Sequence, residues 1–181
     1  MSGRAAVFFD RDGTLMEDVH YCGDPAQVRL YEGVSEALGK LKGAGFRLFV
    51  ITNQSGIGRG LITEEQYQAV QREFLRQLGE DLIDASYYCP DAPGLSSKRR
   101  KPEPGMVLEA AAEHGIDLSA SLFVGDKRAD IECGHRAGTR TIQVQTGYGA
   151  EQECGADYTV KDVVEAVEII RGVNPKFERT R

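Results

Sequence analysis

Short, unbroken apolar segments alternate along this chain with segments whose apolar residues recur at helical spacing, and this alternation limits the folds open to it. The first apolar run ends abruptly at Asp10. Short continuous apolar runs are typical of parallel strands that are buried on both faces. We therefore predict strands at residues 5–9, 46–51, 85–89, 121–125 and 141–145.

The intervening segments predict amphipathic helices. Val34, Leu38 and Leu41 fall on one helical face, and glycines at 43 and 45 end that pattern. Strands that alternate with helices predict a parallel sheet covered on both faces, which short right-handed crossovers arrange as a doubly wound, Rossmann-like α/β fold. The expected helices cover residues 32–42, 63–78, 104–114, a segment that ends near 137, and 162–170, and residues 174–181 are expected to form a frayed tail.

The length of 181 residues predicts a single domain over residues 1–181, with no room for a large cap domain. With 22 Lys and Arg against 28 Asp and Glu, the net charge is −6, which argues against a nucleic-acid partner. No apolar run approaches the ~20 residues of a membrane helix, and the first residues are too polar for a signal peptide. We expect a cytoplasmic protein with no membrane partner and four free thiols, at Cys22, Cys89, Cys133 and Cys154.

Polar clusters follow four of the predicted strands or their loops, where ligands bind in open α/β sheets. Asp10 and Asp12 follow the first strand, and Asp126 follows the fourth. Three carboxylates in one pocket suit Mg²⁺, and a carboxylate can also act as a nucleophile. The alternative for residues 10–13 taken alone is a turn whose acids accept hydrogen bonds from the backbone.

Two further clusters favour phosphate chemistry. Thr52 and Asn53 supply a hydroxyl, an amide and backbone N–H groups at a strand end, which suit phosphate oxygens. Lys101 could neutralise a phosphoryl group during its transfer. Taken alone, the first cluster also fits a glycine-rich turn, and the basic run at residues 98–101 also fits a solvated surface.

Four motifs in these positions resemble those of the haloacid dehalogenase superfamily of phosphotransferases. They are FFDRDGTL at residues 8–15, ITNQSG at 51–56, RRKPEPGM at 99–106 and VGDKRAD at 124–130. They occur in the order of that superfamily and span nearly the whole chain. The resemblance implies a Mg²⁺-dependent phosphomonoester hydrolase with a Rossmann-like core.

DRDGT and RKP are typical of the group within this superfamily that hydrolyses histidinol phosphate and heptose bisphosphates. Residues 18–21, TNQSGIGRG and YYCP are closer to the heptose-bisphosphate members. The resemblance therefore implies removal of the 7-phosphate of D-glycero-D-manno-heptose 1,7-bisphosphate, a small phosphorylated sugar, on the route to nucleotide-activated heptose for lipopolysaccharide.

The resemblance also implies roles for individual residues. Asp10 would attack phosphorus and form an aspartyl-phosphate, and Asp12 would protonate the leaving oxygen and then deprotonate water. Mg²⁺ would be held by the Asp10 carboxylate, the Asp12 carbonyl and Asp126, while Thr52 and Lys101 would stabilise the phosphoryl group. Arg100 would read a second phosphate. The implied substrate-binding residues are Arg11, Asp18, Val19, His20, Tyr21, Asn53, Gln54, Ser55, Arg59, Arg100 and Lys127, with the role of Asp130 left open.

The chain departs from its relatives in the zinc loop, where the group has three cysteines and one histidine. Here only Cys89 keeps its place, and Asp91, Ser97 and Arg99 stand at the other three positions. A structural zinc site needs four ligands, so no structural zinc is expected. The shortened loop is expected to be held by its two prolines and by packing.

Three alternatives remain open at this stage. A histidinol-phosphate phosphatase shares DRDGT, TNQ and RKP, but the arginines at 59 and 100 favour a second anion. A 3′-phosphatase of nucleic-acid ends would use the same core, against the acidic net charge. An inactive phosphosugar-binding module would need a broken first motif. Because one chain carries all four motifs, a monomer is expected.

Overall fold

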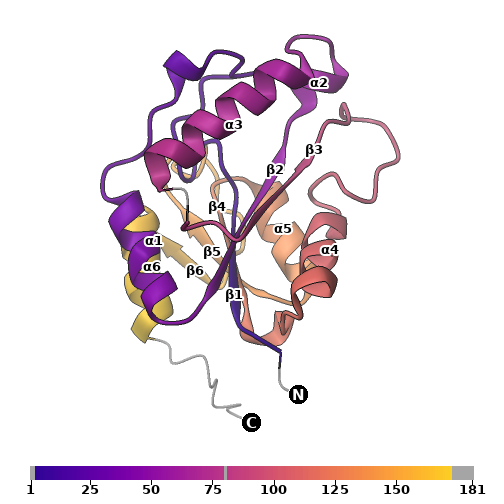
Figure 1. The fold of residues 1–181 in the computed structure, drawn as a ribbon. Coiled ribbons are helices and arrows are strands. Elements are labelled where there is room, and N and C mark those ends of the chain that lie inside the picture. The colour runs from indigo at the N-terminus through magenta and orange to yellow at the C-terminus, as the bar shows by residue number, and fades with distance from the viewer. Residues whose placement is uncertain (1–2, 80, 173–181) are drawn as a thin grey trace.

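A six-stranded, wholly parallel sheet with helices on both faces forms the core of the computed structural model, which describes residues 3–79 and 81–172 (Figure 1). The strand order is β3-β2-β1-β4-β5-β6. This is the predicted doubly wound, Rossmann-like fold. The strands are β1 (Ala6–Phe9), β2 (Arg47–Asn53), β3 (Ala85–Cys89), β4 (Leu122–Gly125), β5 (Arg140–Val144) and β6 (Tyr158–Val160).

The sixth strand is absent from the sequence-based prediction. β6 has three residues and an exposed Thr159 at its centre, so it offers no apolar run to recognise. It adds to the sheet by pairing with β5, with Ile142 opposite Tyr158. β2 also extends beyond the predicted residue 51, because Thr52 and Asn53 pair with β3.

The helices divide between the two faces of the sheet, as Figure 1 shows. α1, α3 and α6 pack over one face, and α4 and α5 cover the other. The tail expected at residues 174–181 lies outside the described residues. The helices are α1 (Val34–Gly43), α2 (Ser55–Gly58), α3 (Glu64–Leu78), α4 (Gly105–His114), α5 (Arg128–Ala137) and α6 (Val163–Gly172), with 3₁₀ turns at Pro25–Gln27 and Leu118–Ala120.

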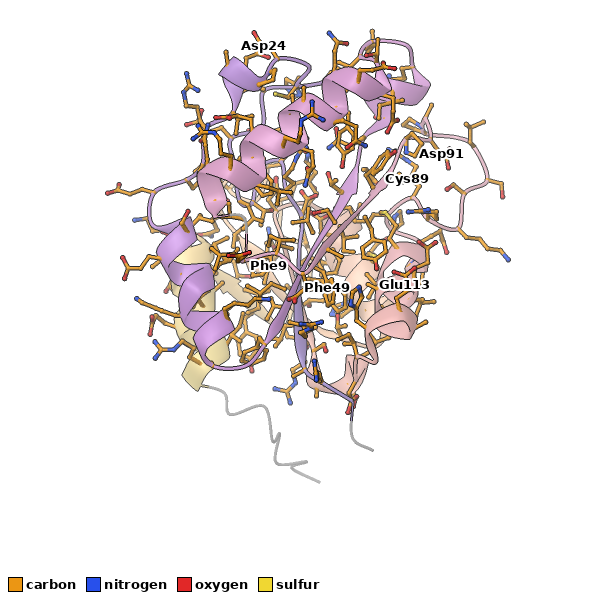
Figure 2. All side chains as sticks on the ribbon, viewed as in Figure 1. Phe9, Asp24, Phe49, Cys89, Asp91 and Glu113 are labelled. Carbon is orange, nitrogen blue, oxygen red and sulfur yellow. The ribbon has the colours of Figure 1, made fainter. Side chains whose placement is uncertain are left out.

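Alternate residues of the central strands supply two separate apolar layers, which explains their unbroken apolar sequences. In β1, Val7 and Phe9 pack on the side of α1, α3 and α6, whereas Ala6 and Phe8 pack on the other side. The ring of Phe8 stacks on that of Phe49, with 5.3 Å between centroids (Phe9 and Phe49 are labelled in Figure 2). A strand buried on both faces needs apolar residues at every position.

The connections carry no inserted domain within the described residues. β1 reaches α1 through residues 10–33, whose regular structure is one 3₁₀ turn. β3 reaches α4 through residues 90–104, which hold no helix or strand. Long loops therefore follow the carboxyl ends of β1 and β3. No helix in the described part of the chain is long and apolar enough to cross a membrane.

Asp84, just before β3, connects the start of β3 to helix α1 and strand β2. Its carboxylate, 8% exposed, accepts from Lys42 Nζ in α1 at 2.6 Å and from the Leu48 N–H in β2 at 2.8 Å. It also pairs with Arg47 at 2.7 Å. Burial raises the pKa of Asp84, but these partners outweigh burial and hold the pKa below its ordinary value of 3.8.

Asp84→Asn is expected to lower the free energy of unfolding at pH 7 by about 2 kcal/mol, because it weakens charge-assisted hydrogen bonds. A lowered pKa means that the stabilisation is complete above the ordinary carboxyl range and is lost as the pH falls through the folded-state value. Urea unfolding at pH 7 and about pH 3 should therefore show the gap between wild type and variant narrowing in acid. The exposed Asp81→Asn variant is the control. An equal gap at both pH values would contradict this role for Asp84.

Candidate active site

Three buried carboxylates and a buried lysine meet at the carboxyl end of the sheet. Asp10 follows β1, and Asp126 follows β4. Oxygen atoms of Asp10, Asp126 and Asp130 lie within 4.8 Å of one another. Lys101 Nζ lies 2.6 Å from Asp10 Oδ1, 2.7 Å from Asp130 Oδ1 and 2.8 Å from the Ile51 carbonyl. The tertiary structure thus brings together groups that are up to 120 residues apart in the sequence, as 10 and 130 are.

The charges of this cluster do not balance among its own members. Burial and the charge of Asp130 raise the pKa of Asp10 well above its ordinary value, although Lys101 opposes the shift. Burial and Asp130 likewise raise the pKa of Asp126. For Lys101, burial lowers the pKa, but Asp10 and Asp130 outweigh it and the net shift is upward. One lysine among three carboxylates leaves room for a further positive charge.

Asp126 lies in a tight backbone cradle. The Thr14 hydroxyl donates to its Oδ1 at 3.2 Å, and the Tyr148 N–H donates to its Oδ2 at 2.9 Å. A Cβ on Gly13 or Gly147, both with positive φ, would lie 2.5 or 2.4 Å from Asp126 Oδ2. Both positions therefore require glycine. Nothing in the sequence drew attention to Gly147 or Tyr148, because neither lies in a recognised motif.

The donor set fits Mg²⁺. Asp10 and Asp126 offer hard, buried carboxylate oxygens, and burial together with the neighbouring Asp130 raises the pKa of both. Asp130, whose role the sequence left open, is already engaged. Its Oδ1 pairs with Lys101 and its Oδ2 accepts a hydrogen bond from the Lys127 N–H at 3.0 Å, so Asp130 holds the Lys101 side chain in place. Gly125 lets it approach, since a Cβ there would lie 2.3 Å from that of Asp130.

Asp12 lies beside this cluster and faces a cavity. Its Oδ2 accepts from Gln54 Nε2 at 2.8 Å and from the Thr52 hydroxyl at 3.4 Å. Arg11 donates to both carboxylate oxygens, at 3.1 Å each. Four donors thus hold one carboxylate in a defined orientation.

A cavity of about 240 Å³ opens next to Asp12. Its lining includes most of the expected sugar-binding residues, and Cys22, Gly56 and Tyr148 as well. Lys127 Nζ lies 2.9 Å from Asp18 Oδ2 and 4.8 Å from the centre of the Tyr148 ring. Partial burial raises the pKa of Asp18, but Lys127 and the His20 N–H together outweigh burial and lower the pKa overall. The lining residues are Asp12, Asp18, His20, Tyr21, Cys22, Asn53, Gln54, Ser55, Gly56, Lys127 and Tyr148.

Four expected substrate-binding residues do not line this cavity. Arg11 is fully buried and points toward α3 instead, and Val19 packs against the apolar core. Arg59 is exposed, with its guanidinium 6.0 Å from the Tyr21 ring centre. Arg100 donates to the Asp91 carbonyl at 2.8 Å. The Arg11 guanidinium donates to Gln71 in α3, which explains why this side chain does not line the cavity next to Asp12.

The loop after β3 is held by hydrogen bonds at the positions where relatives are expected to bind zinc. Cys89 Sγ donates to Asp91 Oδ2 at 3.4 Å and lies 3.6 Å from Ser97 Oγ (Cys89 and Asp91 are labelled in Figure 2). Ser97 Oγ also accepts the Arg100 N–H at 3.2 Å. Pro93 is exposed, so the expectation that the prolines and packing hold the loop is incomplete.

Elemental analysis of the purified protein is expected to find less than one equivalent of zinc. The thiol of Cys89 is satisfied by hydrogen bonds, and burial raises its pKa, so the thiolate that zinc requires is disfavoured. Inductively coupled plasma mass spectrometry after expression in zinc-supplemented medium measures this directly. A full equivalent that is lost in Cys89→Ser would contradict the prediction.

Comparisons with known proteins identify the class. A family model described as HAD-hydrolase-like matches residues 98–168. A D-glycero-D-manno-heptose-1,7-bisphosphate 7-phosphatase from Chlorobaculum tepidum is 37% identical over 188 residues, covering 92% of this chain and 94% of the relative. The corresponding enzyme of Yersinia pestis is 38% identical, with 92% and 95% covered. The chain belongs to the haloacid dehalogenase-like hydrolases and is a phosphatase.

Within that class, a more particular similarity runs over nearly the whole chain. The crystal structure of a D,D-heptose 1,7-bisphosphate phosphatase from B. bronchiseptica, in complex with magnesium and phosphate, superposes with a TM-score of 0.85 at 28% identity. The match covers 93% of this chain and 98% of that one. A putative HAD-like phosphatase from Mesorhizobium loti gives a TM-score of 0.79 at 33% identity, with 100% and 91% covered. The heptose bisphosphate phosphatases are thus the group that this chain resembles.

Proposed function

We propose that this protein is a Mg²⁺-dependent phosphatase that removes the 7-phosphate of D-glycero-D-manno-heptose 1,7-bisphosphate through an aspartyl-phosphate. The observation that carries the proposal is the buried Asp10 carboxylate, 2.6 Å from Lys101 Nζ and two residues before Asp12, which lines a polar cavity. The names of the relatives support the choice of sugar. The cavity volume of about 240 Å³ suits a small polar substrate rather than a polymer.

Each residue of the cluster has a separate role in the two steps of the proposed reaction. An Asp10 oxygen forms a bond to phosphorus while the bond from phosphorus to the sugar oxygen breaks, and Asp12 gives its proton to that leaving oxygen. Water then attacks the aspartyl-phosphate, Asp12 takes the water's proton, and inorganic phosphate leaves with Asp10 restored. Thr52 and Lys101 stabilise the charge on the phosphoryl oxygens throughout.

Mg²⁺, held by the Asp10 and Asp126 carboxylates and the Asp12 carbonyl, would neutralise phosphoryl charge during this transfer. Asp130 then keeps Lys101 aligned at 2.7 Å. Asp18, His20, Tyr21, Asn53, Ser55 and Lys127 would contact the sugar, because they line the cavity. Tyr148 joins this set through its position beside Lys127.

A substrate comparison tests the proposal. Phosphate release is measured for both anomers of the heptose 1,7-bisphosphate, for histidinol phosphate and for hexose monophosphates, and ranked by kcat/KM, which reports differential binding of transition states. The heptose bisphosphate should rank first, and activity should disappear with a chelator and return with Mg²⁺. A higher rank for histidinol phosphate would replace the proposed substrate, and the absence of turnover with every divalent metal would refute the enzymatic role.

Arg100→Ala tests how a second phosphate is read. Arg100 lies in the loop after β3, close to the site, and its guanidinium has one partner, the Asp91 carbonyl, among the described contacts. If it binds the remote phosphate, its loss should raise KM about tenfold for the bisphosphate, because a hydrogen bond between charged groups contributes ~1.5 kcal/mol or more. KM for a monophosphate should change less than about twofold.

Arg99→Ala is the matched control for this variant. The neighbouring Arg99 is bound by the Tyr88 carbonyl at 3.3 Å and by Glu109 at 3.4 Å, so its removal should affect both substrates equally and little. If Arg100→Ala also changes both KM values equally, Arg100 does not read the second phosphate.

A further inference from the structure

A buried arginine connects Asp12 to helix α3. The Arg11 side chain is fully buried, and its Nε and NH2 groups donate to the two oxygens of Asp12, at 3.1 Å each. The third nitrogen, NH1, points the other way and donates to Gln71 Oε1 at 3.0 Å. The guanidinium also lies over the Tyr67 ring, 5.5 Å from its centre. All three guanidinium nitrogens therefore have a partner, and two of them meet the candidate proton donor.

Gln71 is itself anchored. It lies in the buried stripe of α3, between Val70 and Phe74, where a polar side chain is exceptional. Its amide Nε2 donates to Ser86 Oγ in β3 at 3.1 Å. The amide is thus fixed at both ends, with its oxygen on Arg11 and its nitrogen on Ser86. A hydrogen-bonded path runs from β3 through α3 to the turn after β1.

The chemistry of this path suits positioning rather than catalysis. A guanidinium is planar, so anchoring NH1 fixes the directions in which Nε and NH2 point. Those directions set the orientation of the Asp12 carboxylate. A neutral amide at position 71 accepts from Arg11 without competing with Asp12 for its charge, as a carboxylate would. Gln71 does not line the cavity next to Asp12, so direct contact with substrate there is not its role.

We propose that Gln71 is a positioning residue for phosphate transfer: through Arg11 it holds Asp12 where it can give a proton to the leaving oxygen. The proposal rests on the function proposed above, in which Asp12 is the proton donor. The proposal adds Gln71 to the residues that support the reaction. Gln71 lies 60 positions after Arg11, in α3 and outside the four motifs.

Leaving groups of different basicity test the proposal. Phenyl phosphate and 4-nitrophenyl phosphate are similar in shape, but only the more basic phenolate needs a proton as it departs. Gln71→Leu removes both amide hydrogen bonds while keeping a similar volume. We expect its kcat/KM for phenyl phosphate to fall at least about tenfold, because general acid catalysis contributes on the order of 10²–10⁴. For 4-nitrophenyl phosphate the fall should stay below about twofold.

Two further variants separate positioning from a general loss of structure. Gln68→Leu changes a glutamine one turn earlier in α3, whose amide donates to Glu64 and not to Arg11. It should leave the ratio of the two kcat/KM values unchanged. Ser86→Ala removes only the anchor of Gln71 and should shift the ratio in the same direction by a smaller factor. Thermal unfolding of each variant records any change in stability.

The outcomes distinguish this proposal from the one on which it rests. Asp12→Asn should show the same dependence on the leaving group in a stronger form, and its absence would refute the role of Asp12 itself. A different result is that Asp12→Asn shows this dependence while Gln71→Leu and Ser86→Ala reduce kcat/KM for the two substrates by equal factors, or leave both values unchanged. That result would overturn the positioning role of Gln71.

Discussion

Asp10→Asn is expected to abolish phosphate ester hydrolysis, with kcat reduced by at least about a thousandfold, as for other lost nucleophiles. An amide is a poor nucleophile, and it cannot carry the phosphoryl group as an acyl phosphate. The fold should persist, because the substitution keeps the shape of the side chain. Steady-state phosphate release with saturating Mg²⁺ measures the loss, and thermal unfolding without added metal measures the stability.

Stability makes this variant informative. Burial and the neighbouring Asp130 raise the pKa of Asp10, so the surroundings of Asp10 destabilise its ionised form. A neutral amide removes that cost, while Lys101 keeps Asp130 as a partner at 2.7 Å. Asp10→Asn should therefore unfold at the same temperature as the wild type or higher. Activity near that of the wild type would refute the nucleophilic role, and a large fall in stability would contradict the charge balance described for the cluster.

Lys101→Met is expected to damage both stability and activity. Lys101 is 4% exposed and pairs with Asp10 and Asp130, so its removal leaves buried carboxylates without their cation. Breaking a buried ion pair from one side costs about 3–5 kcal/mol. For a chain of this size, that cost lowers the melting temperature by roughly 10 °C. Calorimetry without added divalent metal should record this fall, and kcat should drop as the phosphoryl charge loses its partner.

A second substitution tests the reason for this loss. If uncompensated charge causes the instability, Lys101→Met combined with Asp130→Asn should recover part of the melting temperature, because one of the unpaired carboxylates is gone. Activity should not recover, since the double variant still lacks the cation beside Asp10. A double variant less stable than Lys101→Met alone would show that packing, and not charge, explains the loss.

The fold could be predicted where one signal was strong. The runs that became β1, β2 and β4 are apolar at nearly every position, because each of these strands contributes to two cores. In β5, polar Thr141 and Gln143 alternate with Ile142 and Val144, which belong to one core. β6 was not predicted, because its three residues, with an exposed residue at the centre, carry no such pattern. The longer helices were recognised from their apolar stripes, with ends displaced by a few residues, as at α1. The four-residue α2 was not predicted, because its sequence SGIG has no such stripe.

The candidate site also contains residues that the sequence predicted and residues that it did not. Asp10, Lys101 and Asp126 were proposed from motifs at strand ends and in the loop after β3, and the fold brings these three side chains together. Gly147 and Tyr148, which hold and border Asp126, lie in a loop after β5 that no motif marks. Their importance comes from a contact between segments that are distant in the chain.

The sequence by itself determined the class of fold and the chemical groups of the site, because apolar periodicity and strand-end motifs are local patterns. It also placed Arg11 between Asp10 and Asp12, the two proposed catalytic acids, without deciding where its side chain would go. Only the tertiary structure decided that. The packing of α3 against the sheet puts Gln71 within 3.0 Å of Arg11, so the guanidinium turns away from the cavity and supports Asp12 from behind. A side chain's direction depends on which distant groups satisfy its hydrogen bonds, and that information lies in the packing of the whole chain.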